Sequence, residues 1–207
     1  DSKYMYIYGG LRKQSRMSVG KISSNLWRLD LKTLQWQEIK AANSPRRAYC
    51  ALWLTEGPNG QTLWLHGGKE HEHGDECSDL FSFDLGSMSD KFEVKWKKQT
   101  AVGDVVPPVQ THTVLVHENE GYFFSGVDEC KRIYKFTPGE GSSNPRWTRL
   151  RQAAASERPC ARQHHSCWII DGKFVVRGGQ DLENECMIDH SASAVPNEPG
   201  SGPGEPE

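Results

Sequence analysis

A cluster of histidine, cysteine and carboxylate side chains is the first place where this sequence could support chemistry. His71, His73 and Cys77 are zinc ligands by residue type. Their H-x-H-x₃-C spacing is not that of a standard structural zinc site, and no second ligand pair follows at a recognisable distance. We therefore interpret this segment as a polar surface loop and expect neither a bound metal nor a cofactor.

A second candidate is a nucleophile pair made by His164 or His165 with Cys160 or Cys167. Such a site needs a positioned thiolate and a third, orienting group, and the sequence indicates neither. Cys167 lies next to Trp168 in an expected strand and is predicted to be a small core residue. The motifs G-x-x-x-x-G-K-[ST], G-x-S-x-G and H-E-x-x-H are all absent from the sequence, so we expect no catalytic residues and no enzyme activity.

Composition narrows the function classes further. The 207 residues are 36% hydrophobic and 10% aromatic, and their 20 Gly and 11 Pro favour short strands and turns. A net charge of −2 argues against nucleic-acid binding, and no apolar run approaches the roughly 20 residues of a membrane helix. All 25 Lys and Arg residues lie in 1–179, whereas 180–207 carries seven acids. Six cysteines without a C-x-x-C pair indicate a reducing, intracellular setting, either cytoplasmic or nuclear.

The elements that would position these residues repeat along the chain. An apolar strand that ends in a glycine pair occurs four times, with the first glycine column at 9, 67, 125 and 178. A second strand follows each of the first three pairs, and then a tryptophan. The signature residues of this repeat are Gly9, Gly10, Gly67, Gly68, Gly126, Gly178, Gly179, Trp36, Trp96 and Trp147.

The segment before each glycine pair repeats as well, at 46–54, 109–116 and 162–170. We place His112, His165 and Tyr49 in one column of this segment. Each unit is therefore predicted to form a four-stranded antiparallel meander. Its second strand ends in the glycine pair and its fourth strand contains the Trp. The glycines would permit close backbone approach, and each Trp would fill the space against the next sheet.

These residues resemble the kelch-repeat family. The resemblance lies in the glycine pair, the downstream Trp, and the strands Leu26-Trp27 to Asp30 and Leu80-Phe81 to Asp84. It covers residues 4–190 and is weakest in the third unit, where Ser125-Gly126 replaces the pair. The resemblance implies an all-β fold built from β-propeller blades. We expect a partial blade 1 (1–40), blade 2 (45–98), blade 3 (108–150), a partial blade 4 (158–190) and a disordered tail (191–207).

About three and a half blades are fewer than the four to eight with which a propeller typically closes. We therefore expect an incomplete, open propeller that is a piece of a larger ring. Its terminal blades would expose an apolar face, so the isolated chain is expected to be marginally stable or self-associating.

The resemblance implies a non-catalytic protein–protein interaction module, with a protein or peptide as partner and no small-molecule ligand. Arginines near a central opening would suit the carboxylates of an acidic segment or a peptide C-terminus. In the other interpretation, Arg46 and Arg162 only brace adjacent blades through backbone carbonyls. Both interpretations stay open. The candidate partner-binding residues are Arg46, Arg47, Gln110, Thr111, Arg162 and His164, beside the loops 11–24, 69–78, 127–131 and 180–185.

Two other functions are alternatives. A substrate-recognition subunit of a cullin-type ubiquitin ligase is suggested by a faint similarity of 158–191 to such kelch proteins, although the 207 residues contain no BTB, F-box or cullin-binding segment. A copper enzyme of the galactose-oxidase type would need Tyr and His ligands with a Tyr–Cys crosslink, and no such arrangement can be matched here.

Overall fold

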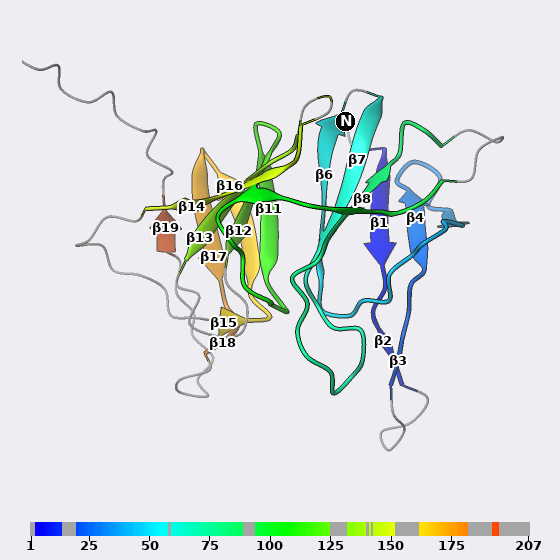
Figure 1. Cartoon of the computed structure of the whole chain (residues 1–207), viewed down its shortest axis with the longest axis horizontal. Helices are drawn as coiled ribbons and strands as arrows, with labels where there is room; N and C mark the ends of the chain where they lie inside the picture. Colours follow the sequence, from blue (N-terminus) through cyan, green and yellow to red (C-terminus); the bar gives the residue numbers. More distant parts are fainter. Residues whose placement is uncertain are drawn as a thin grey trace, which may run out of the picture.

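The computed structural model describes residues 3–13, 20–57, 59–88, 94–124, 132–139, 141, 143–151, 162–181 and 192–194. These residues form antiparallel sheets that stand beside one another, and the described part of the chain contains no helix (Figure 1). Accordingly, no described helix has the length and apolar character needed to span a membrane. The all-β fold class expected from the sequence is confirmed.

Two sheets contain the complete four-stranded meander. Successive strands pair in sequence order in both of them, because each strand is short, rich in aromatic and β-branched residues, and followed by a turn. Blade 3 gains a fifth strand, β10 (Val102–Gly103), which runs parallel to its outer strand. Blade 2 comprises β6 (Ala51–Gly57), β7 (Gly60–His66), β8 (Leu80–Asp84) and β9 (Lys97–Gln99), and blade 3 comprises β11 (Thr113–His117), β12 (Glu120–Phe124), β13 (Ile133–Thr137) and β14 (Arg146–Leu150).

The first and last sheets have three strands each. Blade 1 comprises β1 (Tyr4–Tyr8), β4 (Leu26–Asp30) and β5 (Trp36–Ile39), and blade 4 comprises β16 (Ser166–Ile170), β17 (Lys173–Arg177) and β19 (Ala192–Ala194).

Strand β19 pairs with β17 although it lies in the segment that we expected to be a disordered tail. The edge of a strand such as β17 offers backbone N–H and C=O groups to any extended segment, whatever its composition. Residues 182–190 of the expected blade 4 and the signature glycine Gly126 fall outside the described residues.

Two short two-stranded pairs lie at one end of the sheets. They are formed by β2 (Leu11–Arg12) with β3 (Lys21–Ile22), and by β15 (Arg162–Gln163) with β18 (Gln180–Asp181). Both lie at the lower side of Figure 1. This end, which we call the inner-loop face, also contains the loops that lead into the inner strands β6, β11 and β16.

The core consists of apolar layers between consecutive blades. Tyr8 of blade 1 packs edge-on against Trp96 of blade 2, with ring centroids 4.9 Å apart. Between blades 2 and 3, the ring centroids of Trp64 and Phe136 are 4.8 Å apart. Between blades 3 and 4, those of Phe124 and Phe174 are 6.1 Å apart. Each blade therefore completes the core of its neighbour, as expected for stacked repeats.

The signature tryptophans share one register but differ in burial. Trp36 lies opposite Leu29 as Trp147 lies opposite Phe136. Trp96, just before β9, and Trp147 are buried, whereas Trp36 is 47% exposed. The expectation that every signature Trp fills the space against a neighbouring sheet is thus wrong for Trp36, because no described sheet covers that side of blade 1.

The first two glycine pairs join their blades to the next one. The N–H of Gly10 donates to the carbonyl of Arg47 at 2.8 Å, and that of Gly68 donates in the same way to Val109 at 2.7 Å. A Cβ atom on Gly67 would lie 2.5 Å from the Val109 oxygen, and φ is +68° there. Glycine is therefore required by both close approach and backbone conformation.

Candidate partner-binding surface

The inner-loop face is built from three equivalent loop tips. The inner strands of blades 2, 3 and 4 can be aligned by the first residue pair that each forms with the following strand. These pairs are Ala51 with His66, Thr113 with Phe124, and Ser166 with Arg177. The residues two positions before these strands are therefore equivalent, namely Tyr49, Thr111 and His164.

This register corrects the sequence alignment by one position. The His112 and His165 column contains Cys50, not Tyr49. The sequence comparison matched aromatic with imidazole side chains, whereas strand pairing fixes the true column. A shift of one residue moves a strand side chain to the other face of its sheet.

The three tip residues share an unusual backbone. Their φ angles are +60° at Tyr49, +56° at Thr111 and +56° at His164. A left-handed conformation is uncommon for residues other than glycine, and it is costly for a β-branched residue such as Thr111. The three blades thus keep the same strained backbone conformation at this position, although the side chain differs from blade to blade. Tyr49 and His164 are exposed and Thr111 is half-buried.

The predicted arginines have different surroundings. Arg46 is exposed, whereas the side chain of Arg47 is only 1% exposed and donates to Glu70 at 2.5 Å and to Asp79 at 2.8 Å. Arg162 occupies the position equivalent to Arg47, is also buried, and donates to the carbonyl of Gly178 at 3.0 Å. The burial of Arg47 and Arg162 favours a role in stabilising the loops that carry them over direct contact with a partner. Of the other predicted residues, His164 is exposed and Gln110 is half-buried beside Thr111.

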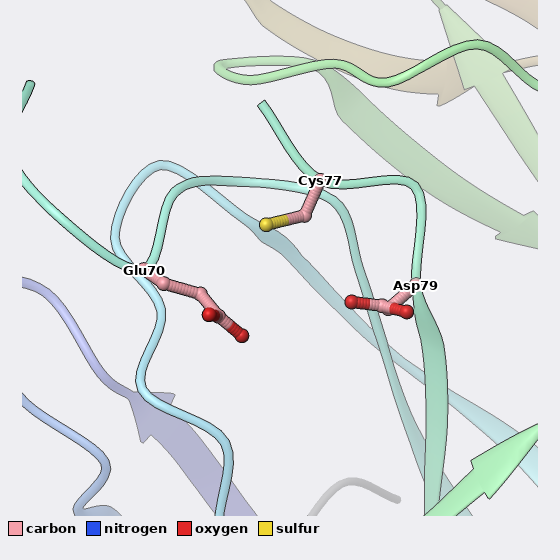
Figure 2. Close-up of side chains that lie close together, drawn as sticks. All are labelled: Glu70, Cys77 and Asp79. Atoms are coloured by element: carbon pink, nitrogen blue, oxygen red, sulfur yellow. The ribbon is translucent and has the colours of Figure 1, made fainter. Parts of the chain in front are cut away.

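A carboxylate and thiol cluster surrounds the Arg47 guanidinium. The ligand atoms of Glu70, Cys77 and Asp79 lie within 4.8 Å of one another. Figure 2 shows these three side chains close together. Arg47 ion-pairs with both carboxylates, and Lys98 also pairs with Asp79.

Partial burial raises the pKa of the Cys77 thiol, which disfavours the thiolate that a metal would need. The cluster is therefore arranged around an arginine. His71 and His73, the zinc ligands suggested by residue type, are exposed and do not belong to it.

Three buried histidines lie behind the inner-loop face. Nδ1 of His66 is 3.3 Å from Nε2 of His112, and both rings pack against Phe123. Burial lowers the pKa of His66 and of His165 to about 4 and that of His112 well below its usual value, so all three are neutral.

Burial also raises the pKa of the Cys167 thiol to about 12, which disfavours the thiolate that a nucleophile would need. Cys160 falls outside the described residues. The contact between His66 and His112 joins blades 2 and 3. The repeat pattern places His112 in one column with His165 but does not indicate that His66 is its partner.

Comparison with known proteins agrees with this architecture. The chain matches the family model described as the KLHDC2/KLHL20/DRC7 Kelch-repeats domain over residues 1–126 and again over 59–193. It is 24% identical to Kelch domain-containing protein 3 of Homo sapiens over 211 aligned residues, covering 91% of this chain and 50% of that protein. It is also 25% identical to Multiple epidermal growth factor-like domains protein 8 of Rattus norvegicus, covering 89% of this chain and 6% of that protein.

The chain thus spans about half the length of Kelch domain-containing protein 3. The two overlapping matches to the family model cover nearly all the residues that form the blades. The glycine pairs, the meander order and the register of the tryptophans agree with that match. The chain belongs to the kelch-repeat family, whose domains typically act as protein–protein interaction modules.

Proposed function

We propose that the inner-loop face binds a peptide segment of a partner protein. The main support is a shared backbone conformation: the equivalent loop-tip residues of three blades all have left-handed φ angles. These residues are Tyr49, Thr111 and His164. Strained non-glycine residues persist only where the surrounding structure holds them, and they concentrate at binding sites. In this chain a rigid repeated backbone presents a different side chain from each of three adjacent blades, which suits recognition of an extended peptide.

Three exposed basic side chains of this face would pair with an acidic partner. Arg12 and Lys21 lie directly opposite each other in the β2–β3 hairpin, and both are exposed. Like charges in directly opposite positions destabilise a strand pair. A carboxylate-bearing peptide would relieve this repulsion and would also pair with the exposed Arg46.

Selection of a ligand from a displayed random-peptide library, followed by fluorescence anisotropy with the best peptide, tests this proposal. Selected peptides are expected to be rich in Asp and Glu. Arg46→Ala and His164→Ala should each weaken binding about tenfold or more. Lys32→Ala, which removes an exposed charge from the β4–β5 turn at the opposite end of the sheet, should change binding less than about twofold. Equal effects of Arg46→Ala and Lys32→Ala would show that the peptide binds elsewhere.

A substrate-receptor role in a cullin-type ubiquitin ligase is a narrower form of the same function. It would use the inner-loop face for substrate and a further segment for the ligase. Co-purification of the full-length protein with a cullin or its adaptor tests that role, and its failure would leave peptide binding unaffected.

A further inference from the structure

One carboxylate of the chain itself is bound at the inner-loop face. Glu72 lies in the loop that follows the glycine pair of blade 2, and its side chain reaches the β2–β3 pair of blade 1. The N–H of Gly20 donates to Oε2 of Glu72 at 2.5 Å, and the ammonium of Lys13 pairs with Oε1. A backbone donor and a cation therefore bind the two oxygens of one carboxylate, which makes both contacts charge-assisted.

The backbone beside this carboxylate leaves room for it. Residue 20 is glycine, and a Cβ atom there would lie 3.1 Å from Oε2 of Glu72 and 2.3 Å from Cδ1 of Leu11. The side chain of Glu72 is only 11% exposed, whereas that of Lys13 is 44% exposed. We call the N–H of Gly20 and the ammonium of Lys13 the carboxylate subsite.

The pKa values of both charged partners shift as an ionic contact requires. The hydrogen bonds from Lys13 and from the N–H of Gly20 lower the pKa of Glu72. The hydrogen bond to Glu72 raises the pKa of Lys13. At neutral pH the subsite therefore binds an ionised carboxylate.

The subsite is surrounded by more positive charge than Glu72 neutralises. Arg12 and Lys21, which lie opposite each other, are the sequence neighbours of Lys13 and Gly20. Among the described residues, no carboxylate lies within ion-pair distance of Arg12 or Lys21. The loop-tip residue Tyr49 is close enough to Lys13 to raise its pKa, so the subsite adjoins the proposed peptide-binding tips.

The loop that carries Glu72 is held at its base by contacts within blade 2. Lys69 forms β-bridges with both Ala48 and Glu76. The residues on either side of Glu72 are exposed. Rotation of the Glu72 side chain would therefore vacate the subsite while both bridges stay in place.

A peptide with several carboxylates would gain more at this place than Glu72 does. Exchange of one carboxylate for another at the subsite costs little, because the same two donors are used before and after. Further carboxylates of the peptide would pair with Arg12 and Lys21 and relieve the repulsion between them.

We propose that Glu72 is an internal competitor for the partner: it fills the carboxylate subsite in the free chain, and an Asp or Glu side chain of the bound peptide displaces it. This inference rests on the proposed function, because it concerns the same face and the same acidic peptide. It adds Lys13 and the N–H of Gly20 to the binding surface. It also means that Glu72 lowers the apparent affinity of that surface, since only the vacated subsite binds the peptide carboxylate.

Fluorescence anisotropy with the selected acidic peptide tests this inference, and an amidated C-terminus leaves only side-chain carboxylates on that peptide. Glu72→Ala should tighten binding about fivefold, because the internal competitor is lost. Asp75→Ala, which removes an exposed negative charge from the same loop, should tighten binding less than about twofold. Adding Lys13→Gln to Glu72→Ala should remove most of the gain. A peptide with amides in place of its carboxylates should bind the wild type and Glu72→Ala equally.

The amide proton of Gly20 reports directly on the subsite. Its NMR signal should move upfield in Glu72→Ala, which lacks the acceptor, and should return downfield when the acidic peptide is added. In the wild type the signal should move little on addition of peptide, because one carboxylate replaces another.

Three results would overturn the inference while leaving peptide binding intact. They are equal gains in Glu72→Ala and Asp75→Ala, weaker or unchanged binding by Glu72→Ala, and a Gly20 signal in that variant that does not respond to peptide. Absence of binding by both the wild type and Glu72→Ala would instead overturn the proposed function. If circular dichroism shows that Glu72→Ala is not folded, Glu72→Gln replaces it with Asp75→Asn as its control, and the same order of affinities is expected.

Discussion

The guanidinium of Arg47 donates a hydrogen bond of 2.8 Å to the carbonyl oxygen of Arg46, the residue before it. A buried, ion-paired arginine therefore fixes the backbone from which an exposed arginine projects. The two neighbours are identical in type but differ in surroundings, since Arg47 is buried and ion-paired whereas Arg46 is exposed. We expect the first to stabilise the loop and the second to contact a partner.

Replacing each arginine with methionine should separate these roles. Arg47→Met leaves Asp79 and Glu70 without their buried partner and should lower the free energy of unfolding by about 2 kcal/mol, the remaining carboxylates being partly exposed. Arg46→Met should change it by less than about 0.5 kcal/mol. Urea denaturation measures both values, and equal values would contradict the bracing role.

The two kinds of signature glycine should differ in their tolerance of alanine. Gly67→Ala places a Cβ 2.5 Å from a backbone oxygen at positive φ, and should cost about 3 kcal/mol or more. Gly178 also has positive φ, but a Cβ added there would meet no atom within 4 Å, so Gly178→Ala should cost only about 1 kcal/mol. The denaturant midpoints of the two variants measure these costs. A larger loss of stability in Gly178→Ala than in Gly67→Ala would show that contact with the next blade does not determine where glycine is required.

Stability should fall as the pH drops below about 6.5, the ordinary pKa of histidine. His66 has a folded-state pKa of about 4, so between these values the unfolded chain binds a proton that the folded chain does not. At pH 5 this one residue should cost about 2 kcal/mol relative to about pH 8, and the loss should level off below about pH 4. His66→Phe, which introduces the residue found at the equivalent position 124, should reduce the slope of the profile, and His112 and His165 should account for the rest. An unchanged slope in that variant would rule out His66 as the source.

Relief of backbone strain should be measurable at Thr111. Thr111→Gly removes a β-branched side chain from φ +56° and should raise stability by about 1 kcal/mol. Thr113→Gly, at the first residue of β11, should instead lower it by a similar amount, because glycine has a lower preference for strands than threonine. Loss of stability in both variants would mean that the tip conformation is not strained.

The blades could be predicted from the sequence because glycine pairs and tryptophans mark the strand ends directly. Arg46 and Arg47 could not be told apart, since their burial depends on Glu70 and Asp79, which are remote in sequence. The contact between His66 and His112 joins two blades and has no local signal. The left-handed tips have no local signal either, because Tyr, Thr and His do not mark such a conformation as glycine does.

Site-specific photocrosslinking tests the proposed binding surface most directly. A photoreactive phenylalanine analogue replaces Tyr49 at a loop tip, or Leu34 in the β4–β5 turn at the opposite end. Leu34 is a matched control because it is 70% exposed and its φ is +56°. With the selected acidic peptide, we expect a covalent adduct from position 49 and none from position 34. An adduct from position 34 alone, or equal yields from both positions, would contradict the account.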